Sequence, residues 1–381
     1  MGCADCLQRG VLLRGLAARL DRIVDRGRGS RARDLLALDD QGLCRAAGTD
    51  LDAELSRQRP AGAEAELEEE LKRLESWSAC RHDPDWPDCF RRLGESAPRA
   101  LFGRGERELL GSLGRGPLVT VIGARRAGPY GLEVATALAR ELAAAGLPVV
   151  SGMALGVDSA AHRGALDGGG LTVAVLASGP ERAYPRARAA LHREIAGSGL
   201  ILSELPPSTS TFRWMFPARN RLMAALAEMT IVVEAAERSG SLITAEMAAD
   251  CGRLVGAVPG PVNSWRSSGA NMLLADGASV VRGSQDVLDH LLGVGAQTAK
   301  APGPRPSEAE SVVLDAVEAG AGLPDPISAA TGLDPDTVDA AIARLELDGY
   351  LAVDFTGRCR RTAQPAPNGG DQALLQLRSP Q

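Results

Sequence analysis

Two neighbouring stretches of this sequence carry side chains suited to binding phosphates. The first runs Phe212-Arg-Trp-Met-Phe216 and leads into Arg219-Asn-Arg221, and the second is Ser239-Gly-Ser241. An apolar run, 230–235, separates them. Guanidinium groups bind phosphate oxygens in pairs, and hydroxyl and backbone N–H groups at the start of a helix attract anions. These residues therefore predict half of a site for a nucleotide or a nucleic acid.

A glycine-containing turn from Gly123 to Gly131 supplies a second candidate phosphate contact. It follows an apolar run and precedes a predicted helix, where glycine lets the backbone approach a phosphate. The spacing is not G-x-G-x-x-G, and Ser151-Gly152 stands where a dinucleotide-binding fold has an acidic residue. A nicotinamide cofactor is therefore disfavoured. Arg125 and Arg126 lie within the turn and favour an extended polyanion as the ligand.

The charge distribution points the same way. The chain has a formal net charge of -6, yet arginines outnumber acidic residues by eleven to seven between positions 121 and 221. Such segregation is typical of a local phosphate-binding surface. Phe212, Trp214 and Phe216 alternate with arginine in a chain that is only 3% aromatic. They could form a base-stacking platform for single strands, or they could fill the edge of a sheet.

The elements that position these residues follow from the hydrophobic pattern. From Leu118 onward, apolar runs alternate with amphipathic segments, which predicts an α/β, Rossmann-like, doubly wound parallel sheet. Strands are expected at 118–123, 148–152, 171–178, 200–204, 230–235, 253–260 and 278–283. Ligands of such sheets bind at the carboxyl ends of the strands, and both candidate turns follow strands directly. Asp158 is expected to cap a helix and His162 to be packed inside one.

The flanking regions predict further domains. We expect a helical domain at 1–95, the sheet domain at 96–295, a linker at 296–306, a winged helix at 307–362 and a disordered tail at 363–381. The helical domain would be SAM-like or helix-hairpin-helix-like, with a docking or a structural role. Asp334 is the expected N-cap of the winged helix's third helix. Residues 334–350 carry five acids and one arginine, which disfavours reading of duplex DNA.

The seven cysteines predict reduced thiols and no metal site. Cys3 and Cys6 form a C-x-x-C pair, but no second pair at zinc-finger spacing follows. His82, between Cys80 and Cys89, could complete a site on paper. No apolar run reaches eighteen residues and no signal peptide is visible, so we expect a cytoplasmic protein without membrane contact.

Several motifs, in order, resemble one family. They are VIGARRAGPYG, SGMALGVDSAAHRGAL, YPRARAAL, FPARNRLMAAL, RSGSLITAE, AVPG and SSGANMLLADGA. Over Leu118 to about Leu292 the chain is similar to the DNA-processing protein A (DprA/Smf) family. The resemblance implies a homodimer with an extended Rossmann-like domain. It also implies that the protein binds single-stranded DNA and loads the RecA recombinase during natural transformation, with neither enzymatic activity nor a cofactor.

The resemblance also implies which residues contact DNA. Arg125 matches an arginine of the glycine loop that contacts the DNA backbone, and Arg186 matches a basic residue that follows Tyr-Pro. Arg213 and Phe216 match a basic and aromatic pair, of which the aromatic residue contacts a base. Arg219 to Arg221 match the family's R-N-R segment. With the residues of the turns, the candidate DNA-binding set is Gly123, Arg125, Arg126, Ser151, Gly152, Arg186, Arg213, Phe216, Arg219, Asn220, Arg221, Ser239, Gly240 and Ser241.

An enzymatic alternative remains open at this point. RSGSLITAE loosely resembles the P-G-G-x-G-T-x-x-E turn of lysine-decarboxylase-like nucleotide phosphoribohydrolases. Glu246 and either Arg219 or Arg221 would then form the catalytic pair, although Ser239-Gly-Ser241 replaces the diglycine. A third reading is a transcriptional regulator that acts through the winged helix, which the acidic third helix weakens.

Overall fold

The computed structural model describes residues 2–24, 35–58, 63–293, 306–348, 350–353 and 357–361. These residues form two compact units, Met1–Thr298 and Ala299–Gln381. Within the described residues, no helix is both long enough and apolar enough to cross a membrane.

One mixed sheet organises the first unit. In the described part of this unit, nine strands have the order β1-β2-β6-β5-β4-β3-β7-β8-β9. Their bounds are β1 Trp77–Cys80, β2 Ala100–Gly105, β3 Val119–Ile122, β4 Val149–Ser151, β5 Thr172–Val175, β6 Leu200–Ser203, β7 Met229–Val232, β8 Leu254–Ala257 and β9 Ser279–Val280. Strands β3 to β9 pair in parallel. They confirm the expected doubly wound α/β fold.

The strand order reverses direction at the centre of the sheet. From β3 the chain proceeds outward through β4, β5 and β6 on one side, and it returns to β7, β8 and β9 on the other. Loops that leave β3 and β7 therefore diverge toward opposite faces of the sheet. This topological switch point leaves a crevice at the carboxyl ends of the strands.

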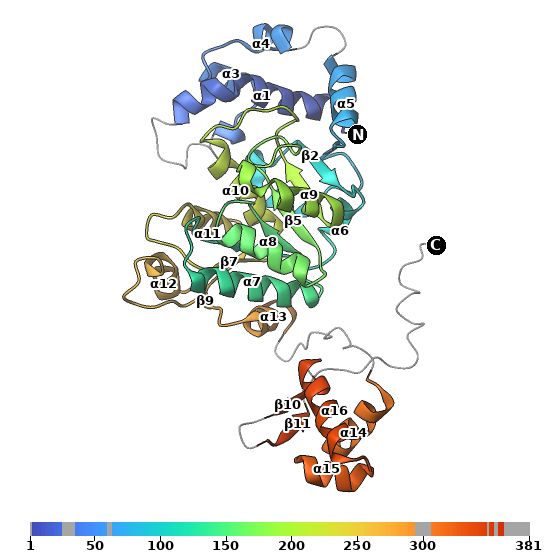
Figure 1. The fold of residues 1–381 in the computed structure, drawn as a ribbon. Coiled ribbons are helices and arrows are strands. Elements are labelled where there is room, and N and C mark those ends of the chain that lie inside the picture. Colours follow the sequence, from blue (N-terminus) through green and yellow to red (C-terminus); the bar gives the residue numbers. More distant parts are fainter. Residues whose placement is uncertain are drawn as a thin grey trace. The chain divides into compact units, whose positions relative to one another are not determined.

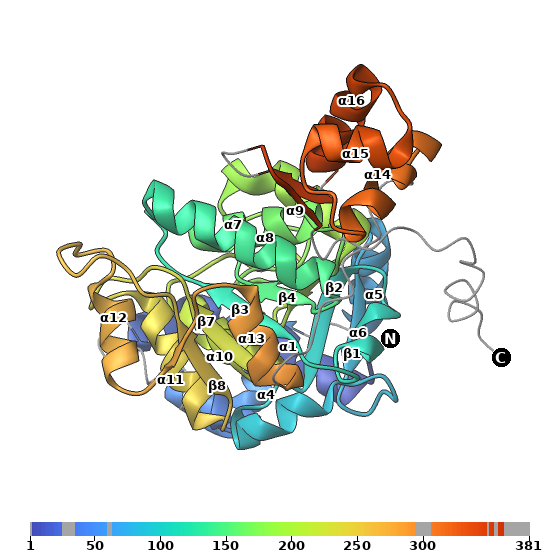
Figure 2. The same cartoon turned by 90° about the horizontal axis from the view of Figure 1, so that it is seen from below.

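Helices cover both faces of the sheet, which explains the uninterrupted apolar strands. One face packs against α7 Pro129–Ala144, α8 Val157–Asp167, α9 Ala189–Ser198 and α13 Ser284–Leu292. The other packs against η1 Asp88–Ser96, α6 Leu109–Ser112, α10 Met215–Leu226, α11 Gly240–Asp250 and α12 Ser268–Ala275. Figure 2 shows α7, α8 and α9 on one side of the strands and α10 and α11 on the other. Along β3, Val119 and Val121 face the first layer and Ile122 faces the second.

The amino-terminal helices are α1 Ala4–Val24, α3 Asp40–Ala46, α4 Leu51–Gln58 and α5 Ala63–Arg73. Figure 1 shows α1, α3 and α4 gathered at one end of the first unit. They share a core with the segment that leads into α10, where the Trp214 indole N–H donates to the Ala17 carbonyl at 3.0 Å. The helical region thus packs beside the segment that carries the candidate site.

The expected helical region, 1–95, includes one strand that the sequence did not predict. After α5 ends at Arg73, β1 pairs antiparallel with β2, which pairs antiparallel with β6. The four residues of β1, Trp-Ser-Ala-Cys, include no β-branched side chain and follow a charged helix directly. Propensity and periodicity therefore give little signal for a strand there. Its pairing with β2 fixes it instead.

The second unit has the expected winged-helix order. It consists of α14 Glu308–Glu318, α15 Pro324–Thr331, α16 Pro335–Leu347, β10 Leu351–Val353 and β11 Cys359–Arg361. Asp334 is the N-cap of α16 and accepts from the Thr337 backbone N–H at 3.0 Å. Asp336 and Asp339 of α16 are exposed, whereas Val338 is buried. The expected tail, 363–381, and the expected linker up to residue 305 lie outside the described residues.

Candidate functional site

A cavity of about 520 Å³ lies at the switch point of the sheet. Loops that follow β3, β4, β7 and β8 border it together with α10. Nine of the residues expected to form the site line this switch-point cavity: Gly123, Arg125, Arg126, Phe216, Arg219, Asn220, Ser239, Gly240 and Ser241. Segments almost 120 residues apart in the sequence therefore meet at one place, as the strand topology requires.

The lining of the switch-point cavity is strongly basic. Five arginines and one acidic residue, Asp158, contribute to it. The arginines are Arg125, Arg126, Arg219, Arg238 and Arg266. Because the whole chain is acidic, this concentration of positive charge creates a local potential suited to a polyanion.

An arginine and two aromatic rings form a stack at one rim of the cavity. The Arg125 guanidinium carbon lies 5.2 Å from the centroid of the Phe216 ring. The ring of Tyr184 packs on Phe216, with ring centroids 5.4 Å apart and ring planes tilted by 51°. Tyr184 is 46% exposed and Phe216 is half-buried. Trp214, by contrast, is only 3% exposed and belongs to the core.

The segment after β8 carries a pair of cavity residues absent from the expected set. Trp265 is 64% exposed, and the Arg266 guanidinium carbon lies 4.8 Å from the centroid of its ring. Both line the switch-point cavity, as does the exposed Arg238. The available signal was an adjacent tryptophan and arginine in the loop after a predicted strand, in a chain with few aromatic residues.

Arg219 forms the floor of the cavity and is only 7% exposed. One of its terminal nitrogens donates to the Gly152 carbonyl at 2.8 Å and also to the Val175 carbonyl. A side chain at Gly152 would place Cβ 2.5 Å from that guanidinium. Burial lowers the pKa of Arg219 to about 10, and the Asp158 carboxylate opposes this shift. Gly152 therefore makes room for Arg219, and both are inside the protein.

Arg221 is buried at 1% exposure and is fully engaged by the protein. Its two hydrogen bonds to the Glu204 carboxylate measure 2.8 and 2.7 Å, and its Nε donates to the Ser96 carbonyl. The expected contact of Arg221 with DNA does not agree with this geometry. Ser151 is likewise internal, because its hydroxyl donates to the Val121 carbonyl at 2.7 Å between neighbouring strands.

The helix that follows the glycine turn is capped from within the protein. Both carboxylate oxygens of Glu234 accept from the Gly128 backbone N–H at the start of α7, at 3.1 and 3.3 Å. An anion at that helix terminus would meet this buried carboxylate, so the glycine turn is not a phosphate cradle. A Cβ on Gly123 would lie 2.7 Å from the Val157 side chain. Close packing therefore explains Gly123, and the turn presents Arg125 and Arg126 as exposed side chains.

The helix that follows β7 has a different terminus. Ser239 caps α11, and its hydroxyl lies 2.7 Å from that of Ser241. Gly240, between these two residues, is exposed. All three border the cavity, so hydroxyl groups and the positive end of the helix dipole face it. Glu246, the candidate catalytic acid, is exposed two turns along α11 and is not among the residues that line the cavity.

Two further members of the expected set lie on the surface outside the cavity lining. Arg186 begins η2, Arg186–Arg188, two residues after Tyr184, and Arg213 precedes α10. Both side chains are exposed. They extend the basic surface from the rim formed by Phe216.

Two polar residues near the cavity floor, Asp158 and His162, are buried in the protein. Asp158 does not cap α8 as expected, since Gly156 is the N-cap and Asp158 accepts instead from the Ala154 N–H at 3.4 Å. Burial raises the pKa of this carboxyl. His162 is fully buried as expected, 2.7 Å from the Thr172 hydroxyl, and burial lowers its pKa to about 3.

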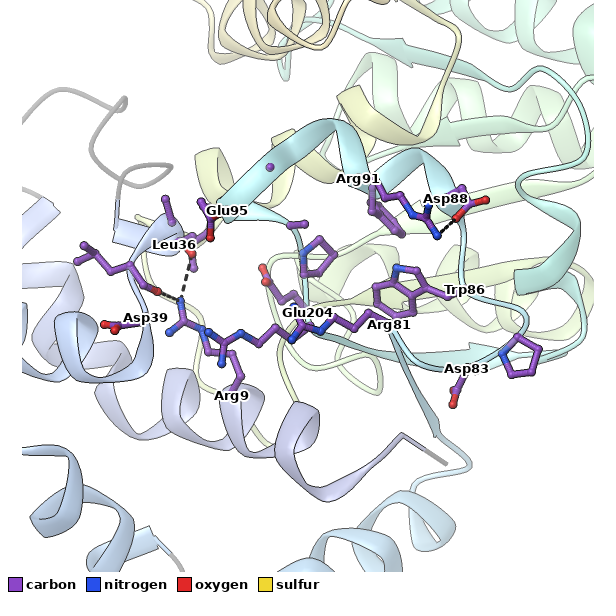
Figure 3. Close-up of a pocket in the computed structure, with 18 residues that line it drawn as sticks. Arg9, Leu36, Asp39, Arg81, Asp83, Trp86, Asp88, Arg91, Glu95 and Glu204 are labelled. Carbon is purple, nitrogen blue, oxygen red and sulfur yellow. Dashed lines mark hydrogen bonds and ion pairs between the residues drawn. The ribbon is translucent and has the colours of Figure 1, made fainter.

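A second, larger cavity has a balanced charge. It measures about 630 Å³ and lies between the amino-terminal helices and the η1 region. Figure 3 shows arginines and acidic residues alternating around it, among them Glu204, the partner of Arg221. Since acids match arginines there, this cavity is poorly suited to a polyanion.

Comparisons with known proteins indicate a family for this chain. Residues 77–292 match the family model of DNA recombination-mediator protein A, and residues 297–353 match the DprA winged helix domain. A DNA processing protein of Mycobacterium tuberculosis is 41% identical over 289 residues, which are 74% of this chain and 69% of that relative. One from Bacillus subtilis is 37% identical over 194 residues, 51% of this chain and 64% of the relative.

Solved structures show the same similarity. DNA processing protein A from Streptococcus pneumoniae aligns with a TM-score of 0.60 at 31% identity, over 76% of this chain and 99% of that one. The Helicobacter pylori protein, described for its single-stranded DNA binding mode, aligns with a TM-score of 0.51 at 33% identity, over 57% and 96% of the two chains. The family model covers more than half of the sequence. The chain belongs to the DNA-processing protein A (DprA/Smf) family.

Proposed function

We propose that this protein binds single-stranded DNA along the basic rims of the switch-point cavity and acts in DNA recombination. The observation that carries the proposal is the stack of Arg125, Phe216 and Tyr184 beside a cavity lined by five arginines and one acid. Cations bind the phosphates, and an aromatic face accepts a base of any sequence. The single-stranded DNA binding described for the Helicobacter pylori relative supports the same ligand.

The stack favours single strands over duplexes. A base can stack on Phe216 or Tyr184 only when it is free of its own helical stack. The exposed arginines Arg125 and Arg126 would hold the phosphates on either side of that base, and Arg186 and Arg213 would continue the path. A duplex could use the arginines but not the rings. The preference for single strands therefore rests on Phe216 and Tyr184.

The start of α11 and the pair Trp265 and Arg266 complete the proposed surface. Ser239, Gly240 and Ser241 would donate to a phosphate at the positive end of the helix. Trp265 and Arg266 would contact the strand as it leaves the cavity. Gly123, Ser151, Gly152, Arg219 and Arg221 would act indirectly, because they shape the floor and hold α10 in place, and Asn220 lies at the cavity wall between floor and rim.

Three further properties are proposed from family resemblance alone. The protein would load RecA onto the bound strand during natural transformation, work as a homodimer, and perform no catalysis. A cytoplasmic location is proposed from the sequence, which has no long apolar run and no visible signal peptide. Against an enzymatic role, Glu246 is exposed and is not among the residues that line the cavity. A nucleotide phosphoribohydrolase would need that carboxylate beside the arginines.

The test compares binding of labelled single-stranded and duplex oligonucleotides of equal length by fluorescence anisotropy, with the full-length protein. We expect tighter binding of the single strand, and faster assembly of RecA on that strand when the protein is present. Equal affinity for the two DNA forms would contradict the role of the rings. Release of free base from a nucleoside monophosphate, abolished by Glu246→Ala, would establish the enzyme instead.

A further inference from the structure

Four metal-binding side chains meet at the edge of the sheet, far from the switch-point cavity. Cys3 lies just before α1 and Cys6 lies in its first turn, whereas Cys80 ends β1 and His82 lies in the turn that follows. Their three sulfurs and one imidazole nitrogen all lie within 4.8 Å of one another. In sheet order, β2, β6, β5 and β4 separate β1 from β3.

The distances among these atoms fit a tetrahedral metal site. Nδ1 of His82 lies 3.3 Å from the Cys3 sulfur, 3.5 Å from the Cys6 sulfur and 3.9 Å from the Cys80 sulfur. Zinc bonds of about 2.3 Å to sulfur and about 2.0 Å to nitrogen place sulfur and nitrogen ligands about 3.5 Å apart. One imidazole nitrogen can make a single conventional hydrogen bond, so hydrogen bonding does not explain three sulfurs around it.

The surrounding backbone holds the four side chains in place. The Cys3 N–H donates to the Cys80 sulfur at 3.3 Å, which ties the residues before α1 to the end of β1. The Asp83 carboxylate accepts from the Cys80 N–H at 3.1 Å and pairs with Arg107 at 3.0 Å. The turn around His82 is thus fixed from outside. Arg81 and Asp83, on either side of His82, also line the larger cavity (Figure 3).

We propose that Cys3, Cys6, Cys80 and His82 bind one structural Zn²⁺ ion. Three thiolates and an imidazole are ligands that zinc prefers, whereas Mg²⁺ and Ca²⁺ require oxygen. Four protein ligands close the coordination shell and leave no position for a reacting water. Cys6 and Cys80 are buried while Cys3 and His82 are exposed, so a metal ion can enter from solvent.

The proposed ion would fasten the amino terminus to the sheet. Cys6 and Cys80 belong to a small core in which α1 and α5 pack on β1 and β2. The two halves of the site are 74 positions apart, from Cys6 to Cys80, so the ion would close a long loop and restrict the unfolded chain. Its role would be to hold the helical region against the sheet, with metal binding coupled to folding.

Elemental analysis of the full-length protein, purified without chelator, tests the proposal. We expect about one zinc per chain in the wild type and in the control Cys89→Ser, and loss of that zinc in Cys3→Ser and His82→Ala. A chelator should lower the wild-type melting temperature and leave that of Cys3→Ser unchanged. Single-stranded DNA affinity of Cys3→Ser should match the wild type, which separates this site from the proposed function.

A second measurement covers the case in which a variant does not fold. Wild-type protein reconstituted with Co²⁺ should show the intense visible bands of a tetrahedral thiolate site. Absence of stoichiometric metal together with absence of those bands would overturn the proposal. Iron or copper in place of zinc, or a disulfide between two of the three cysteines in mass spectra, would overturn it as well.

Discussion

The rim and the floor of the switch-point cavity use the same residue type in opposite ways. Arg125 and Arg126 at the rim are exposed, whereas Arg219 at the floor is 7% exposed. Arg221, two residues further along α10 and outside the cavity lining, is 1% exposed. These two buried arginines donate to carbonyl groups and to Glu204. The rim arginines project toward solvent or lie against an aromatic ring.

This difference separates two contributions to one site. A buried arginine that is saturated with protein acceptors stabilises the framework, and removing it leaves acceptors and a carboxylate without a partner. An exposed arginine contributes little to folding but releases counterions when it binds a phosphate. Substitutions of the buried arginines Arg219 and Arg221 should therefore change stability, and substitutions of the rim arginines should change DNA binding.

The largest effect is expected from Arg221→Met. The change leaves the half-buried Glu204 carboxylate without its cation and the Ser96 and Ala218 carbonyls without their donor, which should lower the free energy of unfolding by about 3 kcal/mol. Urea denaturation measures it. The rim variant Arg126→Ala should stay within about 0.5 kcal/mol of the wild type. The double variant Arg221→Met/Glu204→Met should regain much of the lost stability. A wild-type stability for Arg221→Met alone would remove the distinction between the buried and the rim arginines.

A pH-dependent loss of stability is expected from His162, beside the floor. Burial, aided by the Arg219 charge, lowers its pKa from 6.5 to about 3 in the folded state. The unfolded chain therefore binds a proton that the folded protein excludes between these values, and stability falls as pH decreases from 6.5 toward 3. The free energy of unfolding at pH 5 should therefore be about 2 kcal/mol lower than at pH 8.

Urea denaturation at pH 5, 6 and 8 measures this effect. The pH dependence should be weaker in His162→Gln and unchanged in the rim variant Arg125→Ala. Identical pH profiles for wild type and His162→Gln would show that the histidine is protonated inside the folded protein.

A loss of affinity without a loss of stability is expected from Phe216→Leu. Leucine keeps the apolar contact with the core but removes the ring, so the dissociation constant for single-stranded DNA should rise about tenfold. The salt dependence of binding should not change, because no phosphate contact is lost. Phe212→Leu, at a half-buried aromatic outside the cavity lining, serves as the matched control. Equal losses in the two variants would locate the base elsewhere.

The smallest effect is expected from the winged helix. Because exposed Asp336 and Asp339 face solvent on α16, a fragment of residues 305–381 should not bind duplex DNA at physiological salt. Replacement of both acids by arginine should create weak binding of the duplex. Gel-shift assays of the two fragments measure this, and binding by the unaltered fragment would contradict the expectation.

The sequence was sufficient for the framework of the sheet and for the stretches that border the cavity. Strands β3 to β9 are predictable because each is a short apolar run between turn residues. Burial of individual polar residues was not predictable. Nothing in Arg219-Asn-Arg221 indicates that both arginines turn inward, since their acceptors come from Gly152, Val175, Ser96 and Glu204, all distant in the sequence.

Long-range pairing also explains what the sequence analysis missed at the amino terminus. Strand β1 becomes a strand only through its pairing with β2, and that pairing brings Cys80 beside Cys3. In the sequence, Cys80 and His82 could be named as possible partners of the C-x-x-C pair, but their spacing gave no sign that they lie beside it. In the same way, the acceptor role of Glu234 at the start of α7 depends on β3 and β7 being neighbours. Spatial neighbours of this kind are set by topology and not by local spacing.

The most direct test of the central claim is the salt dependence of single-stranded DNA binding. The rim double variant Arg125→Ala/Arg126→Ala is compared with Arg115→Ala/Arg140→Ala, which alters exposed arginines at the amino ends of the strands. We predict that the slope of log K against log salt becomes shallower by about 1.4 in the rim variant, at about 0.7 per phosphate contact. It should stay at the wild-type value in the other variant. Equal slopes for both would contradict a DNA path along the cavity rim.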